Sequence, residues 1–482
     1  MTSSKQDWAI YLIFSVFLVL QISATFSTTQ LSYSESYSNI VKAIDKSSGV
    51  HQGFYLFLKG VVFLLNSLKI SQATQIVILK CLSIILSGII LFLAYSLIIR
   101  VSNDNKKSFF ALILLVTSPV IYLMTANTLF TESFVLILIL ATLNSWINSI
   151  NNKKTTFDLI ILSSILIISS PLSAFFIIVI YVYLLLHLLE FKKILSFERE
   201  IAIYSTFLYA AYYIFFFRDY LLNKNLALII QEFLSPIYSS LTQINISYLP
   251  QLVGPTTILF GIYAIYSELT NIKKSKKIFY MLTALIIVSF SFTVLRISNV
   301  YFLLSVLAIS LSIASARAIT ALNSFFMKSR FSNKAKNAFL TAAILLNISF
   351  AAIFLPQAII TNISNSIPED IVKFLNAIDN NYNESIRIIS CEETSPLIEF
   401  YTKHNSVYED LKAEDKEELI QIYNSPLEIR IIEMLKKYNA KCIMLTDFER
   451  EMFNTDSLKA VDLDLIRLKL NISNNLLYCM EK

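Results

Sequence analysis

The chain has 482 residues, of which 55% are hydrophobic and only 15% charged, and its formal net charge is +6. Its mean hydropathy of +0.62 is far above the values of soluble domains. This composition excludes a soluble globular protein and predicts a polytopic α-helical membrane protein.

Apolar runs suited to membrane-spanning helices recur along the chain from Ile10 to Leu355. A helix needs about 20 apolar residues to cross the hydrocarbon core of a bilayer. We count eleven runs, at residues 9–25, 76–99, 108–124, 131–148, 157–171, 173–190, 200–217, 251–268, 277–294, 300–316 and 337–355. The fifth and sixth runs are short, and they predict either an antiparallel pair with a tight turn or a single kinked helix.

Basic residues between these runs predict the orientation, because Lys and Arg beside a span are retained on the cytoplasmic side. One set of alternate loops holds 18 of the basic residues before Asn365, and the other set holds 8. The N-terminus is therefore expected in the cytoplasm and, with an odd number of spans, the C-terminal part outside the plasma membrane. The net positive charge faces anionic lipid and implies no nucleic-acid partner.

The first outer loop covers about residues 26–75 of the membrane domain, which we place at 1–364. Within this loop, Phe54 to Leu68 is apolar but contains Lys59. A span here would invert every later loop against the charge rule. The segment is therefore expected to be a re-entrant or interfacial helix.

The composition changes at Asn365, because residues 365–482 carry a net charge of −8 and the preceding part carries +14. This tail alternates helical and strand patterns, which predicts an extracytoplasmic α/β domain. The pattern places a helix at Pro368 to Ala377 and strands at Ile386 to Ile389, Cys442 to Leu445 and Leu476 to Met480. A capping Ser followed by Pro predicts further helix starts at Ser395 and Ser425.

Four cysteines are too few for a disulfide scaffold, and three of them, Cys391, Cys442 and Cys479, lie in the tail beside predicted strands. Buried thiols in a small core are the simpler interpretation, although neighbouring strands would also bring a pair within bonding distance. His51, His187 and His404 are isolated in the sequence, so no spacing predicts a metal site.

Ionisable residues gather at the predicted outer ends of the spans, where they are costly enough to need a reason. Such a set suits glycosyl transfer from a polyprenyl-phosphate sugar. A carboxylate would take the proton of the acceptor hydroxyl, and a cation would neutralise the leaving phosphate. The residues are Glu35, Asp45 and His51 in the first loop, Glu132 in the next outer turn, Arg218 in the long outer loop, and Arg296 shortly before Tyr301.

The first loop resembles that of the GT-C superfamily of membrane glycosyltransferases, which includes protein O-mannosyltransferases, aminoarabinose transferases and oligosaccharyltransferases. The resemblance rests on Glu35-Ser36-Tyr37, then Gly49, His51 and Phe54-Tyr55-Leu56, with Gln52-Gly53 where that family commonly has prolines. The stretches Thr117-Ser118-Pro119 to Thr131-Glu132-Ser133 and Arg296 to Tyr301 are similar to later elements of the same family.

The resemblance implies an inverting transfer from a polyprenyl-phosphate-linked sugar to an extracytoplasmic glycan, lipid or protein acceptor. It implies Glu35 as catalytic base or acceptor-positioning acid, Glu132 as a second acid and Arg296 as a phosphate ligand. We add Tyr37, His51, Arg218 and Tyr301 as candidate substrate contacts. No cofactor is expected, although a divalent metal stays open because oligosaccharyltransferases use one.

Each of these residues also has a purely structural interpretation. Glu35 would be a solvated loop acid, and Glu132 an acid at a helix N-terminus stabilised by the helix dipole. Arg296 and Lys80 would extend to lipid head groups, the interpretation we favour for Lys80. His51 fits a structural hydrogen-bonding role better than a catalytic one, and an interfacial aromatic belt explains most of the outer tyrosines.

Two other functions remain open. A flippase or transporter of lipid-linked sugars predicts polar residues along a path through the span centres, which are nearly free of charge here. A non-catalytic membrane scaffold with an outer binding domain predicts that Glu35 points into bulk solvent.

Overall fold

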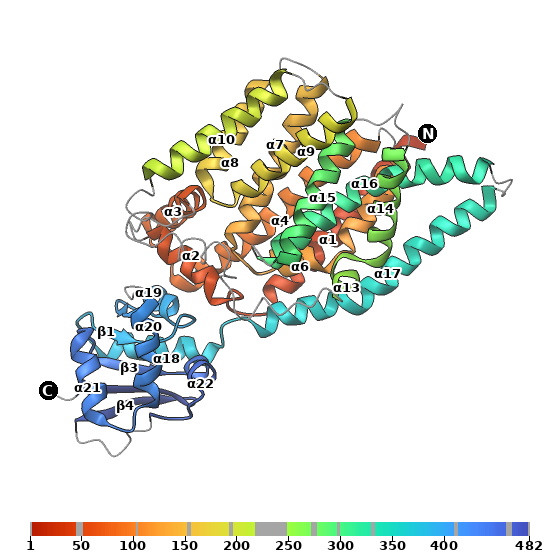
Figure 1. The fold of residues 1–482 in the computed structure, drawn as a ribbon. Coiled ribbons are helices and arrows are strands. Elements are labelled where there is room, and N and C mark those ends of the chain that lie inside the picture. Colours follow the sequence, from red (N-terminus) through yellow and green to blue (C-terminus); the bar gives the residue numbers. More distant parts are fainter. Residues whose placement is uncertain are drawn as a thin grey trace. The chain divides into compact units, whose positions relative to one another are not determined.

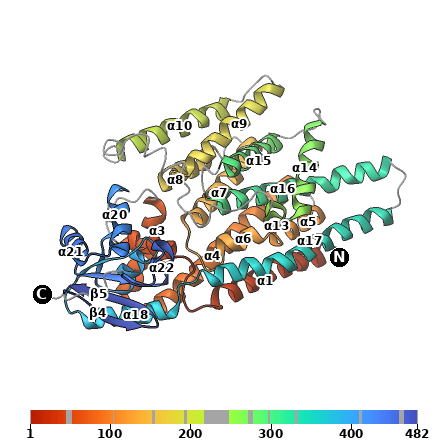
Figure 2. The same ribbon diagram turned by 60° about the horizontal axis from the view of Figure 1, so that its bottom comes forward.

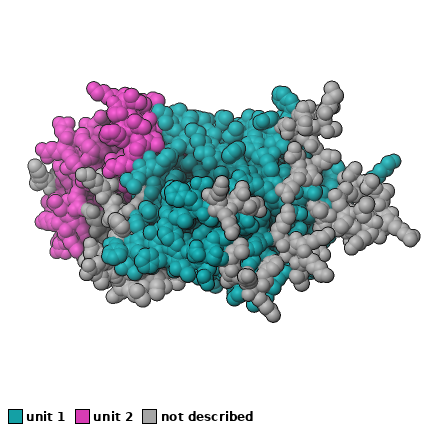
Figure 3. Space-filling model, turned by 90° about the horizontal axis from the view of Figure 1, so that it is seen from above, with its two compact units in different colours: residues 1–27, 48–57, 77–363 teal, residues 28–47, 58–76, 364–482 magenta. Residues whose placement is uncertain are grey.

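The computed structural model describes residues 2–44, 52–102, 105–151, 156–191, 196–216, 248–270, 277–295, 299–328, 333–408, 413–458 and 465–480. They form two compact units (Figure 3). Unit 1 comprises residues 1–27, 48–57 and 77–363, and unit 2 comprises residues 28–47, 58–76 and 364–482. The first outer loop is thus divided between the two units.

Unit 1 is entirely helical in its described parts, which confirms the polytopic α-helical class. Its longer helices are α1 (Thr2–Phe26), α4 (Gln72–Ser102), α5 (Asn105–Val116), α7 (Thr131–Asn151), α8 (Thr156–Ser169), α9 (Ser173–Phe191), α10 (Ser196–Phe216), α14 (Pro255–Thr270), α15 (Lys277–Leu295), α16 (Val300–Lys328) and α17 (Asn333–Ser364). Two short helices, α6 (Pro119–Thr125) and α13 (Leu249–Val253), complete the set.

All eleven predicted runs coincide with helices. Among the described residues, seven helices are long and apolar enough to cross a membrane, or eight if α5 and α6 form one span. The helices α8, α10 and α14 are not among them. Helices α8 and α9 are separate and packed against each other, so the kinked single helix is wrong for this pair.

Helix α16 is the central helix of unit 1 and packs against α5, α6, α7, α14 and α15 (Figure 1). Small residues such as Ser305, Ala308 and Ser312 let the neighbouring backbones approach it closely. Gly261 of α14 lies so near Leu311 that a Cβ atom there would sit 2.6 Å from its side chain. This close packing holds the middle of α16 against α14.

The third predicted run, 108–124, is not one straight helix. It divides into α5 and α6, which meet at an angle of 58°. Ser118 precedes Pro119, and a residue before proline is driven out of the helical region, as its ψ of 112° shows. The Ser118 hydroxyl donates to the carbonyl of Val253 at 2.8 Å, which ties the break to the end of α13.

Unit 2 contains a five-stranded sheet in the order β2-β1-β3-β5-β4, which confirms the predicted α/β domain. Figure 2 shows the neighbouring strands β5 and β4 of this sheet. The strands are β1 (Arg387–Ile389), β2 (Asn405–Ser406), β3 (Cys442–Leu445), β4 (Ile466–Ile472) and β5 (Asn475–Met480). The first three are parallel, and β5 runs antiparallel to both β3 and β4.

Helices of unit 2 pack around this sheet, and they are α18 (Glu369–Asn381), α19 (Ser395–Tyr401), α20 (Ala413–Asn424), α21 (Glu428–Lys437) and α22 (Asp447–Phe453). Helix α2 (Ser34–Ile44) of the same unit packs against α19. The predicted helix starts need correction: Thr394 precedes α19 as its N-cap, and α21 begins only at Glu428. In both cases the helix is entered through a Ser-Pro pair without the Ser side chain capping it.

Helix α3 (Gln52–Ser67) forms where the sequence predicts an interfacial helix. It is apolar but too short for the membrane-spanning class. Leu56, Phe63 and Leu64 are exposed along it, as is Lys59. An exposed apolar face of this kind suits a helix lying in the head-group region.

Two of the tail cysteines form a disulfide. Cys442 of β3 and Cys479 of β5 are direct cross-strand partners and are bonded to each other, whereas Cys391 is a buried free thiol. The simpler interpretation of three buried thiols is therefore wrong for Cys442 and Cys479. Disulfides persist in oxidising compartments outside the cytoplasm.

Replacing both Cys442 and Cys479 with Ala is expected to lower the free energy of unfolding by about 2–4 kcal/mol, because the bridge closes a loop in the unfolded chain. Thermal unfolding of the purified chain in detergent measures this change. Cys81→Ala, which removes an exposed thiol, serves as the control and is expected to unfold like the wild type. Equal unfolding temperatures for all three proteins would show that the bridge does not form.

Candidate functional site

Glu35 lies in the first turn of α2 in unit 2, where an acidic side chain interacts favourably with the helix dipole. A hydrogen bond ties this turn to the residues before the helix, because the Ser36 hydroxyl donates to the Ser32 carbonyl at 2.8 Å. Glu35 is partly buried, and its Oε2 atom is shielded from solvent. At least one oxygen of the carboxylate therefore does not face bulk solvent.

Tyr37 is fully buried on the opposite face of α2. Its hydroxyl donates to Gln30 Oε1 at 3.0 Å and accepts from the Leu31 N–H at 3.2 Å. Burial raises the pKa of Tyr37 to about 12, so the phenol stays protonated at neutral pH. A sugar has no exposed face of this ring to stack on, and Tyr37 acts as an anchor for α2.

Glu132 lies in the first turn of α7 in unit 1 and is only 6% exposed. Its Oε1 atom accepts from Asn299 Nδ2 at 3.4 Å. Its Oε2 atom is also buried, and no hydrogen-bond partner for it lies among the residues that the structure describes. A buried carboxylate oxygen without a partner is destabilising, which makes Glu132 a candidate for a role with a bound substrate.

Asn299 orients this carboxylate. Its Oδ1 atom accepts from the Tyr301 N–H at 3.0 Å, so Asn299 caps the N-terminus of α16 while its amide group contacts Glu132. Tyr301 itself is nearly buried in the first turn of that helix. Two helix N-termini therefore meet at Glu132, and such termini favour negatively charged groups.

The position of Lys80 differs from the sequence prediction that its side chain extends to lipid head groups. It is 1% exposed, and its ammonium group donates to the Thr25 carbonyl at 3.1 Å and lies 5.9 Å from the centre of the Phe26 ring. The side chain is therefore enclosed by protein and does not reach the lipid head groups. A buried cation is costly unless charged or polar groups neutralise it.

Lys80 and the loop that precedes Glu132 are held by the same residue. The Thr25 hydroxyl accepts from the Asn127 N–H at 3.2 Å, and Asn127 adopts a left-handed conformation with φ of 58°. From α17, Asn362 Nδ2 donates to the Ala126 carbonyl at 2.9 Å. Thr25 thus connects Lys80 to the loop that leads into α7.

The other predicted site residues, Asp45, His51, Arg218 and Arg296, lie outside the described residues. Lys80, Asn299 and Asn362 were not selected as site residues from the sequence. The available signal is a polar side chain within or beside an apolar run, which for Lys80 equally fits a lysine that extends to the head groups. Among the described residues, no group of His, Cys, Asp and Glu side chains is arranged to hold a metal.

The carboxyl ends of β1 and β3 are where an α/β domain commonly binds a ligand. Glu449 occupies this place in unit 2: its Oε1 accepts from the Cys391 N–H at 3.0 Å and its Oε2 from the Thr446 N–H at 2.8 Å. The hydroxyls of Thr394 and Thr446 also donate to it. The donors that an anionic ligand would use are already satisfied.

A scan of the sequence against protein-family models matches none, and no curated protein sequence matches it. Solved structures do match. The archaeal oligosaccharyltransferase AglB from Archaeoglobus fulgidus, in complex with an inhibitory peptide and a dolichol-phosphate, aligns with a TM-score of 0.62 at 12% identity, over 93% of this chain and 70% of its own.

ArnT from Cupriavidus metallidurans aligns over 98% of both chains, with a TM-score of 0.60 at 11% identity in the apo state. Its complex with undecaprenyl phosphate aligns with a TM-score of 0.56 at 10% identity. Both proteins have the GT-C fold, and the fold that the sequence resemblance predicts is therefore confirmed for this chain.

Proposed function

We propose that this chain, whose fold is that of the GT-C glycosyltransferases, transfers a sugar from a polyprenyl-phosphate carrier to an extracytoplasmic acceptor. The observation that carries the proposal is the alignment over 98% of the chain with ArnT, which has been solved bound to undecaprenyl phosphate. AglB, solved with a dolichol-phosphate, is a second carrier-binding protein of the same fold.

The reaction is an inverting displacement at the anomeric carbon. A carboxylate takes the proton of the acceptor hydroxyl, the hydroxyl oxygen forms the new glycosidic bond, and the bond from that carbon to the phosphate oxygen breaks. We assign proton removal to Glu35, and to Glu132 the positioning of the acceptor or donor hydroxyls. The leaving phosphate needs a cation. Buried Lys80 is a candidate for that role, and so are Arg218 and Arg296, which lie outside the described residues.

The proposed orientation places the N-terminus in the cytoplasm and unit 2 outside the plasma membrane. The excess of basic residues in one set of alternate loops supports it. The disulfide between Cys442 and Cys479 also supports it, because such bonds are rare in the cytoplasm. The acceptor would then be a glycan, lipid or protein of the cell envelope.

Binding of undecaprenyl phosphate tests the carrier assignment without knowledge of the sugar. A ligand that binds only the folded protein stabilises it by about 2.7 kcal/mol at a hundredfold excess over its Kd. The wild type in detergent is therefore expected to unfold at a higher temperature with undecaprenyl phosphate present, and not with undecaprenol. An equal response to both lipids would contradict recognition of the phosphate.

Lys80→Met is expected to abolish most of this stabilisation and to lower transfer by about 10²–10³-fold, as loss of one charge-stabilising group does. Methionine fills a similar volume, so the protein itself is expected to remain folded. Lys59→Met, which removes an exposed lysine from α3, is the matched control and is expected to behave like the wild type. Unchanged transfer in Lys80→Met would remove this residue from the site.

A further inference from the structure

We propose that the Tyr401 hydroxyl, together with Gln30, is a positioning element for Glu35. By this contact, the part of unit 2 after residue 364 determines the position of the first turn of α2. The inference rests on the role proposed for Glu35, but it is carried by contacts within unit 2 alone.

Three buried polar groups meet between α19 and the segment that leads into α2. The Tyr401 hydroxyl lies 3.1 Å from the Tyr37 hydroxyl and also hydrogen-bonds Gln30 Oε1, to which Tyr37 donates as well. All three side chains are buried. Burial raises the pKa of both phenols, so the two hydroxyls remain protonated donors.

Contacts between aromatic rings hold Tyr37 in addition to these hydrogen bonds. The Tyr37 ring lies 5.1 Å from the Phe400 ring and 5.6 Å from the Tyr401 ring, measured between centroids. Tyr37 is two residues after Glu35 on an eleven-residue helix. A rotation or translation of α2 that moved the Glu35 carboxylate would therefore have to break the contacts of Tyr37 with Phe400 and Tyr401.

Backbone contacts secure the approach to α2 on the same unit. The Tyr33 N–H donates to the Asn365 carbonyl at 2.8 Å, and Ser32 forms an isolated antiparallel bridge with Ser366. At the far end of the first loop, Gln72 Nε2 donates to the Phe400 carbonyl at 2.7 Å. Both ends of the loop segment in unit 2 are thus fixed to residues after 364.

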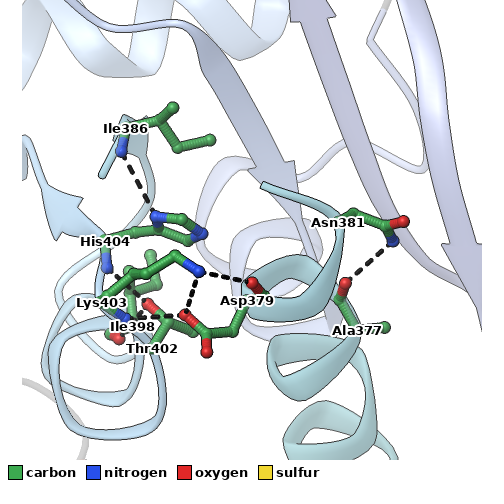
Figure 4. A network of polar contacts seen from close by, with 8 residues as sticks. All are labelled: Ala377, Asp379, Asn381, Ile386, Ile398, Thr402, Lys403 and His404. Carbon is green, nitrogen blue, oxygen red and sulfur yellow. Dashed lines mark hydrogen bonds and ion pairs between the residues drawn. The ribbon is translucent and has the colours of Figure 1, made fainter. Parts of the chain in front are cut away.

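Helix α19 is itself held firmly, as Figure 4 shows for the residues that follow it. The Lys403 N–H donates to Asp379 Oδ1 at 2.9 Å, which ties the end of α19 to α18. His404 Nδ1 accepts from the Ile386 N–H at 3.3 Å, and burial lowers the pKa of His404, which keeps that nitrogen an acceptor. The Tyr401-Thr402-Lys403-His404 stretch therefore supports α19.

Tyr401→Phe tests the inference, because it removes one hydroxyl and leaves the ring packing. Misplacing a catalytic group by about 1 Å can lower a rate by about 100-fold, and we expect kcat per folded molecule to fall by about 10- to 100-fold with the KM for the donor unchanged. The matched control is Tyr423→Phe. Tyr423 is also a fully buried tyrosine of unit 2, and its hydroxyl donates to the Met444 carbonyl at 2.9 Å, away from the first loop.

A readout independent of activity is the maleimide labelling rate of Glu35→Cys in a Cys81→Ser background. Adding Tyr401→Phe is expected to raise this rate several-fold, and adding Tyr423→Phe to leave it unchanged. Equal kcat and equal labelling in the two phenylalanine variants would overturn the positioning role even if Glu35→Gln is inactive. Full activity of Glu35→Gln would instead overturn the proposed role of Glu35, whatever the labelling shows.

Discussion

Glu35→Gln is expected to lower kcat by about 10²–10⁴-fold, which is the contribution of a general base that takes a proton in the transition state. Glutamine has nearly the same shape and keeps an acceptor oxygen, so α2 and its buried face should be preserved. The amide cannot accept the proton of the acceptor hydroxyl. Stabilisation by undecaprenyl phosphate is expected to match the wild type, because the change removes the base and leaves the carrier contacts.

Glu369→Gln is the matched control for this substitution, because it neutralises a well-exposed acid of α18 in the same unit. Its surface ion pair with Lys373 contributes at most about 1 kcal/mol. If Glu369→Gln turns over normally and Glu35→Gln loses turnover, the loss is due to the Glu35 carboxylate and not to removal of any acid in this unit. If Glu35→Gln kept full turnover, Glu35 would be a loop acid and the mechanism given above would be wrong.

Glu132→Gln is expected to lower transfer by about 10²-fold or more while leaving the unfolding temperature unchanged or raised. A buried charge is costly, so neutralising it without loss of volume should not destabilise the fold. The amide carbonyl can still accept from Asn299 Nδ2, which preserves the geometry of the two helix N-termini. Loss of activity with retained stability is the signature of a group kept for function.

Glu198→Gln distinguishes this result from a general effect of removing a buried acid. Glu198 also lies in the first turn of a helix in unit 1 and is fully buried, but it accepts from the Tyr183 hydroxyl at 2.7 Å and pairs with Lys277 at 3.4 Å. Its neutralisation should lower stability and spare turnover. The opposite outcome for Glu132→Gln, lower stability with normal turnover, would make Glu132 a helix-terminal acid and no more.

Hydrophobic run length was the most informative sequence feature for the fold, because a bilayer sets the length of its spans. The position of every predicted run agrees with a helix, including 157–171 and 173–190, where Pro171 follows the break at Ser170. The bend between α5 and α6 also has a local cause in Ser118-Pro119, although run length alone predicts one span there.

The site was harder to predict, because burial depends on contacts that are distant in sequence. Nothing local distinguishes Lys80, enclosed beside Thr25, from a lysine that reaches the head groups. Asn299 contacts Glu132 across 167 positions of the chain. The sequence also does not decide whether the tail cysteines form a disulfide. Cys442 and Cys479 become partners only through the pairing of β3 with β5.

Transfer of a sugar from a polyprenyl-phosphate carrier is tested by measuring the release of free polyprenyl phosphate by the purified protein. The protein is placed in nanodiscs and supplied with lipid-linked sugars and cell-envelope acceptors from its own cells. We predict that the wild type releases polyprenyl phosphate and forms a glycoside of inverted configuration, and that Glu35→Gln does neither. Lipid-linked sugars left intact by the wild type, or moved unaltered to the other leaflet, would contradict the claim.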